Sequence, residues 1–287
     1  MSAPITVPPF PDNRPAKTGN PQTVTLYGAE HIGKTESVTK LPGTVKIIML
    51  QPGGGDHLAG SFMDIHQLTD AGKFGKKPDG TNVDYDDAFY ATLEWAVREN
   101  IAGKPIADFV VFDRIDRIED WIFKRALKTF RSTLIGGSEK FKDLTSVTDV
   151  PGVGSQGSPG WKFVREEMRR TMDLMKMSAR YVVLITGVRD KVQLSNMPKV
   201  AGEPNPNDLD LTGGLRKLVC NESSSFGFMY RDDQSNVRLN FKSSDKAVCG
   251  TYCQHLRGRE FIIGKVNAAL ETLYDWSSIY LNEPPKP

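Results

Sequence analysis

The sequence lacks several features that would place a protein in a specialised class. Its 287 residues include only 3 cysteines, and this small, odd number argues against a disulfide framework and for a reducing cytoplasm. No apolar run approaches the length that crosses a bilayer. The first residues are rich in proline and have neither the basic start nor the apolar core of a secretory signal. We therefore expect a cytoplasmic protein that does not span a membrane.

The chain also lacks a large excess of charge of either sign. The formal net charge is only +2, and the hydrophobic share of 39% is ordinary for a globular chain. The chain has no global basic field of the kind that attracts nucleic acid, so any nucleic-acid surface must be local.

The most informative stretch that the chain does contain is Gly28-Ala-Glu-His-Ile-Gly-Lys34-Thr35. Its spacing is that of a phosphate-binding loop, in which glycines turn backbone N–H groups onto an anion, the lysine reaches the β- and γ-phosphates, and the threonine hydroxyl ligates Mg²⁺. The helix that follows adds its positive end. An ordinary glycine-rich turn is the alternative. The residues that we expect to contact ATP are Gly28, Ala29, Glu30, His31, Ile32, Gly33, Lys34, Thr35 and Glu36.

Short apolar strands separated by helical segments predict an α/β fold, with a mostly parallel sheet sandwiched by helices. The expected buried strands are 23–27, 45–50, 107–113 and 180–186. The expected helices are 34–40, 86–100, 115–130 and 161–178, with a further helical pattern at Leu58, Phe62, Ile65 and Leu68. The C-terminal portion is predicted to be β-rich, with strands at 215–221, 226–231, 237–241 and 260–263 and a final helix at 265–276.

The predicted organisation is one domain over residues 22–276. A proline-rich, extended or disordered arm at 1–21 precedes it, and a tail at 277–287 follows it. Two polar loops interrupt the domain, at about 134–160 and 187–214, and loops of this length are usually functional or mobile.

Ligands of parallel sheets bind beyond the carboxyl ends of the strands, where this sequence places Gly28, Gln51, Asp113 and Thr186. Asp113 is the expected partner of Thr35 in holding Mg²⁺, although an aspartate that caps the next helix would occupy the same position. Thr186 is a candidate for sensing the γ-phosphate. We expect these strand ends to share one crevice.

Hydrolysis also needs a group that orients or deprotonates water. Gln51 can orient a water molecule through its amide but cannot act as a carboxylate base. Asp56 is a second candidate in the glycine-rich turn that follows, and turn formation is the alternative role for both residues. Glu30 is a third, although its negative charge inside the loop should weaken ATP binding unless it points outward.

Two other patterns have a functional and an ordinary interpretation. Basic residues recur on two helices that flank the first long loop, as expected for binding a nucleic-acid backbone but also for a solvated helix face; they are Lys124, Arg125, Lys128 and Arg131, then Lys162, Arg165, Arg169 and Arg170. Cys249, Cys253 and His255, with Cys220, resemble a metal-ligand set, for which buried thiols are the more ordinary interpretation.

The order of these parts resembles the RecA-type P-loop ATPase core, and more specifically the phage-encoded single-domain ATPases of single-strand DNA annealing and recombination. The resemblance covers residues 22–264. Besides the phosphate loop, the matching segments are Ile47-Ile-Met-Leu-Gln-Pro-Gly-Gly-Gly55, Val110-Val-Phe-Asp113, Val182-Val-Leu-Ile-Thr186, Leu211-Thr-Gly-Gly-Leu-Arg216 and His255-Leu-Arg-Gly258.

This resemblance implies a RecA-like sheet, with ATP and Mg²⁺ as cofactors. It implies single-stranded DNA as a partner, contacted near residues 136–160 and 187–214, and assembly into a homo-oligomeric ring or filament. Arg257 or Arg259 of a neighbouring subunit is the candidate for completing the site. A phage-encoded protein of this kind would act in the host cytoplasm.

Two departures from the family pattern concern hydrolysis. Gln51 stands where the family usually has a catalytic glutamate, and Glu30 and His31 stand where such loops often have small residues. We therefore predict a weak ATPase, stimulated by DNA or by a neighbouring subunit, with Lys34, Gln51, Asp113 and Thr186 as its catalytic residues. The alternatives are a non-hydrolysing nucleotide-binding scaffold or assembly protein and, with less support, a DNA motor.

Overall fold

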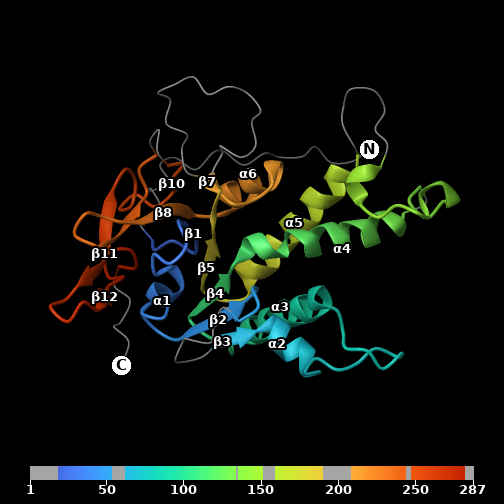
Figure 1. Ribbon diagram of the computed structural model, residues 1–287, viewed down its shortest axis with the longest axis horizontal. Coiled ribbons are helices and arrows are strands. Elements are labelled where there is room, and N and C mark those ends of the chain that lie inside the picture. The colour runs from blue at the N-terminus through green and yellow to red at the C-terminus, as the bar shows by residue number, and fades with distance from the viewer. Residues whose placement is uncertain are drawn as a thin grey trace, which may run out of the picture.

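A ten-stranded sheet forms the centre of the molecule (Figure 1). The computed structural model describes residues 19–53, 62–133, 135–150, 159–189, 208–243 and 247–281. Within these residues the strand order is β12-β11-β9-β8-β1-β5-β4-β2-β3, and β10 pairs with β8. The protein is thus of the mixed α/β class, with a large, mostly parallel sheet and helices.

The parallel part of the sheet contains the strands that the apolar runs predict. It comprises β1 (Thr23–Tyr27), β2 (Val45–Met49), β3 (Phe62–Asp64), β4 (Phe109–Asp113), β5 (Tyr181–Thr186) and β8 (Ser225–Arg231). Tyr27 pairs with Thr186, and Asp113 pairs with both Ile185 and Met49. The carboxyl ends of β1, β5, β4 and β2 therefore lie side by side, which confirms the predicted meeting of these strand ends.

Beyond β8 the sheet continues as antiparallel strands: β9 (Val237–Asn240), β10 (Gly250–Thr251), β11 (Glu260–Val266) and β12 (Thr272–Tyr274). This is the predicted β-rich C-terminal portion. A separate two-stranded sheet pairs β6 (Val188–Arg189) with β7 (Asp208–Leu209) directly after β5.

Five of the described helices cover one face of the parallel strands. They are α2 (Ile65–Asp70), α3 (Tyr85–Ile101), α4 (Glu119–Arg131), α5 (Gly160–Met177) and α6 (Gly213–Glu222). Figure 1 shows α3, α4 and α5 together on one side, with β11 and β12 at the opposite end of the molecule. A short 3-10 helix, Ile115–Ile118, leads from β4 into α4.

Alternate residues of each central strand enter two separate cores. In β4, Val110 and Phe112 pack into the core under α3 to α6. Phe109 and Val111 pack into the second core, which α1 (Lys34–Val38) and the chain around Trp276 cover. Burial on both faces explains why the strand is a continuous apolar run rather than an alternating one.

Two predicted elements in the C-terminal portion are wrong. The predicted strand 215–221 is helix α6, because Leu215, Leu218 and Val219 share one face of a helix that packs against α5. The predicted helix 265–276 is instead the hairpin of β11 and β12. The Asn267 side chain accepts backbone N–H bonds from Ala269 and Glu271, which fixes a turn there.

The remaining differences lie at element boundaries. Phe62, expected on a helix, begins β3, and α2 starts three residues later. Residue 58 of that pattern and residues 1–18 of the predicted arm lie outside the described residues. The predicted tail is partly core, since Ile279 and Tyr280 are buried beside Trp276. None of the described helices has both the length and the apolar character that a membrane span requires.

Candidate functional site

The loop between β1 and α1 packs closely against its neighbours at two glycines. A Cβ on Gly28 would lie 2.4 Å from the carbonyl oxygen of Met229, and a Cβ on Gly33 would lie 2.1 Å from the hydroxyl of Tyr274. Gly33 also has a φ of 93°, in the region that favours glycine. The two glycines of the sequence motif are thus explained by close packing against β8 and β12.

Lys34 holds its ammonium group beneath this loop. Nζ donates hydrogen bonds to the carbonyl oxygens of Gly28 at 2.7 Å and Ala29 at 2.6 Å. An ammonium has three donors, so one is left for an anion. Burial, and secondarily the positive charge of Arg114, lower the pKa of Lys34 to about 8. The lysine is therefore a buried cation whose charge an entering anion would stabilise.

Thr35 and Asp113 meet across the site, as predicted. The Thr35 hydroxyl donates to Oδ2 of Asp113 at 2.5 Å, although the two residues are 78 positions apart. Asp113 is only 2% exposed. Burial raises its pKa, and the Thr35 hydrogen bond and the charge of Lys34 oppose that rise. A hydroxyl and a carboxylate side by side are the oxygen ligands that Mg²⁺ prefers.

A cavity of about 360 Å³ opens in front of these groups. It brings together most of the predicted site residues with two that were not predicted, Met49 and Arg114. Its lining consists of Glu30, His31, Gly33, Lys34, Thr35, Glu36, Met49, Gln51, Asp113 and Arg114. Gly28, Ala29 and Ile32, also predicted to contact ATP, belong to the same loop but are not part of this lining.

Gln51 contributes an amide from the end of β2. Its Oε1 atom is buried and accepts no hydrogen bond from any described residue. Buried polar oxygens normally have a partner, so this atom marks a position suited to a water molecule or a ligand hydroxyl. Asp56, the second candidate for activating water, lies outside the described residues.

Arg114 forms ion pairs with carboxylates at the cavity. Its guanidinium contacts Oε1 of Glu30 at 3.0 Å and Oδ2 of Asp116 at 3.1 Å. Asp210, just after β7, lies 3.9 Å away. Sequence reasoning missed both Arg114 and Asp116. The available signal was the run of charges Asp113-Arg-Ile-Asp116 immediately after a buried strand.

Thr186 lies next to this network rather than in the cavity lining. Its hydroxyl donates to Oδ1 of Asp116 at 3.2 Å, and the backbone N–H of Gly187 donates to the same oxygen at 3.3 Å. The end of β5 is therefore connected to the cavity through Asp116 and Arg114. A direct contact between Thr186 and a γ-phosphate stays a prediction.

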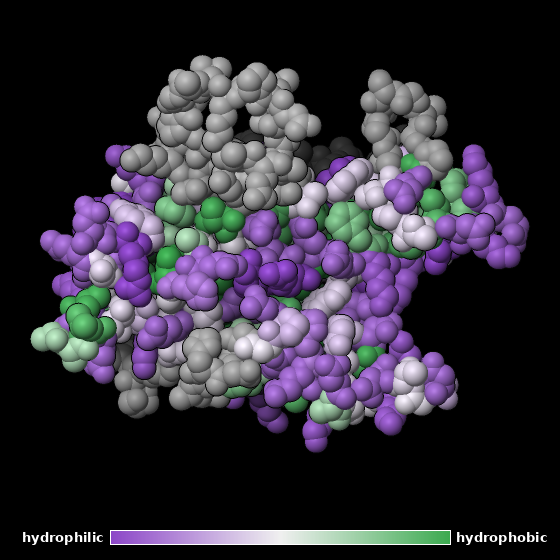
Figure 2. Space-filling view, in the orientation of Figure 1, coloured by the Kyte–Doolittle hydropathy of each residue, from purple (hydrophilic) through white to green (hydrophobic). Residues whose placement is uncertain are grey.

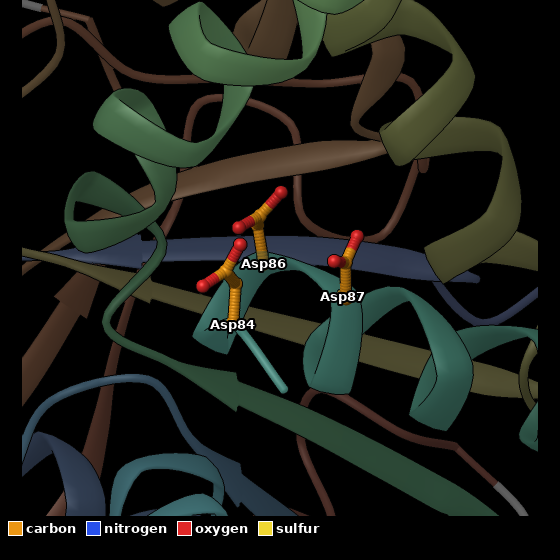
Figure 3. Close-up of side chains that lie close together, drawn as sticks. All are labelled: Asp84, Asp86 and Asp87. Carbon is orange, nitrogen blue, oxygen red and sulfur yellow. The ribbon is translucent and has the colours of Figure 1, made fainter. Parts of the chain in front are cut away.

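The basic face of α4 is not a free basic surface. Figure 3 shows the carboxylates of Asp84, Asp86 and Asp87 close together at the start of α3. Lys124 lies 2.8 Å from Asp86, Lys128 3.2 Å from Asp86, and Arg125 3.4 Å from Asp87. The acidic cluster thus neutralises these cations. The fourth member of the face, Arg131, donates to the carbonyl oxygens of residues 142 and 144.

The predicted Cys/His metal-ligand set and the two candidate arginines, Arg257 and Arg259, lie in the C-terminal half. Among the residues that the structure describes, Asp84, Asp86 and Asp87 are the only three potential metal ligands close enough to share an ion. Cys249 and Cys253 are buried thiols, and Nε2 of His255 lies 2.9 Å from the carbonyl oxygen of Ile279. Arg257 and Arg259 are exposed, as a residue that acts on a neighbouring subunit must be.

Comparison with known proteins adds no assignment to this geometry. No model of a known protein family matches the chain, and no curated protein matches its sequence.

Proposed function

We propose that this protein binds ATP with Mg²⁺ at the cavity in front of Lys34, as a P-loop protein of the RecA-like type. The observation that carries the proposal is the contact between Thr35 and Asp113 beside a buried ammonium group. The residues fit the ligand: the loop leaves a lysine donor free, and the two oxygens suit a hard cation. Lys34 and the loop would hold the phosphates, and Thr35 and Asp113 the metal, which would neutralise phosphate charge.

The proposed reaction is slow hydrolysis of ATP to ADP and phosphate. Gln51 is placed to orient a water molecule, but an amide cannot remove a proton, and general-base catalysis typically contributes about 10²- to 10⁴-fold in rate. Stimulation by DNA or by a neighbouring subunit would then decide the turnover. Gln51 also favours the second candidate, a non-hydrolysing scaffold whose shape depends on bound nucleotide. A DNA motor has less support.

Single-stranded DNA is the proposed partner. The pairing of the α4 cations with Asp84, Asp86 and Asp87 leaves α5 as the better candidate surface. Its basic residues are exposed: Lys162, Arg165, Arg169 and Arg170. Lys162 pairs with Glu166 at 3.7 Å and Arg169 with Glu222 at 4.0 Å; both distances are long, and exposed pairs of this kind contribute little. The parts of the two predicted DNA loops at 151–158 and 190–207 lie outside the described residues.

We also propose that the protein assembles into a ring or filament through the β12 edge of the sheet. The turn and strand that form its edge expose Leu270 by 85% and Leu273 by 60%. Figure 2 shows hydrophobic residues at this end of the molecule, on a face that is otherwise largely hydrophilic. An exposed apolar edge strand is a common site of contact between chains.

Calorimetric titration of ATP with excess Mg²⁺ tests the nucleotide site. Lys34→Ala should abolish detectable binding, because it removes the ammonium group that lies against the loop carbonyls, and chelation of Mg²⁺ should weaken binding to the unaltered protein. Lys40→Ala is the matched control, since this exposed lysine follows α1 by two positions. Equal affinities for the two alanine variants would contradict the proposal.

ATP turnover with and without single-stranded DNA separates the two candidates. The ATPase candidate requires measurable phosphate release that increases with DNA, whereas the scaffold candidate requires tight ATP binding and no release under either condition. A DNA contact should also weaken steeply as salt is raised. No DNA binding at low salt would remove DNA as the partner.

A further inference from the structure

Arg114 holds two carboxylates that differ in how firmly they are fixed. Asp116 is buried and also accepts hydrogen bonds from Thr186 and the Gly187 backbone. Glu30 is 69% exposed, and among the described residues its hydrogen bond is to Arg114 alone. The Arg114 side chain is only 15% exposed. The arginine is therefore held firmly by the buried contact with Asp116 and less firmly by the exposed contact with Glu30.

We propose that the Glu30 carboxylate and a nucleotide phosphate compete for the same position on Arg114, and that Arg114 exchanges Glu30 for the terminal phosphate when ATP binds. This inference rests on the proposed nucleotide site and adds a residue that distinguishes triphosphate from diphosphate. The exchange is a replacement of one anionic oxygen by another on the same guanidinium. It breaks no covalent bond and requires no proton transfer.

Charge favours this exchange. Glu30 and Arg114 both line the cavity with Lys34, so a bound triphosphate would lie close to the Glu30 carboxylate. Like charges at such distances repel, and a terminal phosphate carries more charge than one carboxylate. A guanidinium donates to carboxylate and phosphate oxygens with the same fork geometry. Arg114 also holds the pKa of Glu30 below its usual value, so Glu30 is ionised at neutral pH and competes as an anion.

The position of Arg114 selects the terminal phosphate. It follows Asp113 directly in the chain, and Asp113 contacts the Thr35 hydroxyl that would hold the metal. Magnesium in phosphate-loop sites bridges the β- and γ-phosphates. Arg114 therefore lies on the metal side of the cavity. Because Asp116 keeps its bond to the guanidinium, the exchange would also connect the terminal phosphate to the end of β5.

The test compares ATP and ADP affinities by calorimetry in four proteins: unaltered, Glu30→Gln, Glu36→Gln and Arg114→Lys. Glu30→Gln should bind ATP about two- to fivefold more tightly, the range that loss of an exposed ion pair allows, with a smaller gain for ADP. Glu36→Gln is the comparison, because it removes the same charge from another residue of the same cavity lining. Its gain measures the effect of cavity charge alone and should be smaller than that of Glu30→Gln, whose carboxylate pairs with Arg114.

Arg114→Lys keeps the positive charge next to Asp116 but cannot hold two anions in a fork. It should weaken ATP about tenfold or more while changing ADP little, as expected for loss of a charge-assisted hydrogen bond. In the Arg114→Lys protein, the further substitution Glu30→Gln should then increase the affinity for ATP by no more than Glu36→Gln increases it in the unaltered protein. The melting temperature of each nucleotide-free protein checks that the variants fold.

The outcomes separate this inference from the proposed function. If the unaltered protein binds ATP and Lys34→Ala does not, but Glu30→Gln and Glu36→Gln bind ATP equally, the nucleotide site stands and the exchange is overturned. The exchange is also overturned if Arg114→Lys weakens ATP and ADP alike. If no protein binds ATP, both the proposed site and the exchange are overturned.

Discussion

Lys34 is a residue of the site whose charge depends on its surroundings. Burial, and then the neighbouring Arg114, lower its pKa to about 8 from a usual value of 10.5. Phosphate binding favours the protonated ammonium, so affinity should be highest below about pH 8. It should fall as pH rises through that value, by at most about tenfold per pH unit for one coupled proton. Titrations of the protein with ATP at pH values from about 6.5 to 9.5, in roughly half-unit steps on both sides of the lowered pKa, measure this pH dependence.

Lys34→Arg is the control for that pH dependence, since a guanidinium stays charged across the range. Its affinity for ATP is expected to be weaker at neutral pH but to vary less with pH. A parallel decline in both proteins would mean that another group titrates. The low pKa assigned to Lys34 would then not govern binding.

Residue patterns predicted the centre of the site but not its edge. Lys34, Thr35 and Asp113 were identified because each performs a defined task at a fixed place in a motif or strand. Arg114 could not be identified in this way. Its importance comes from Glu30 and Asp116, which lie 84 positions before it and 2 after it, and only the fold shows that both reach the same guanidinium.

The β1–α1 loop and strand β12 pack together, and Gly33 is a point of contact. Gly33→Ala should destabilise the protein by about 1–3 kcal/mol, because alanine is strained at a φ of 93° and its Cβ would overlap the Tyr274 hydroxyl. Tyr274→Phe in the same chain removes that overlap, and the next atom of the ring lies 3.3 Å away. The double variant should therefore recover part of the loss, as measured by urea unfolding.

Backbone strain and side-chain overlap make separate contributions in this comparison. Recovery should be incomplete, since the left-handed backbone at position 33 persists in the double variant. Tyr274→Phe alone is the control, and its own effect is subtracted in the cycle. If the changes in unfolding free energy of the two substitutions are strictly additive, the Tyr274 side chain of β12 does not restrict the loop at position 33.

Elements were predictable where burial alone decides their type. Strands β1, β2, β4 and β5 are buried on both faces and read as short apolar runs. Helix α6 and the β11–β12 hairpin were assigned to the wrong type because their sequences suit either structure. What decides them is packing against α5 for α6, and pairing with β9 together with the Asn267 turn for the hairpin. The local sequence of each segment does not show which element it packs against or pairs with.

At the scale of the whole molecule, the C-terminal segment closes the second core against α1. Trp276 is buried, and its indole N–H donates to the carbonyl oxygen of Ser37 at 2.8 Å. The β-rich portion is therefore attached directly to the helix that carries Lys34 and Thr35. A contact between chains at the outer edge of that portion would lie on the same sheet as the proposed nucleotide site, which gives assembly a physical route to influence binding.

The outer edge itself supplies the last prediction. Leu270→Glu with Leu273→Glu should convert an assembled protein to monomers in light scattering after gel filtration with ATP, Mg²⁺ and an oligothymidine. The reason is that two buried charges would replace apolar contact at the β12 edge. Both leucines are exposed in the single chain, so its melting temperature should change little. Ile101→Glu is the matched control, since Ile101 is 71% exposed at the end of α3 and lies away from that edge. Assembly that survives the double substitution would place the contact between chains elsewhere, and a monomer under every condition for the unaltered protein would remove the ring or filament altogether.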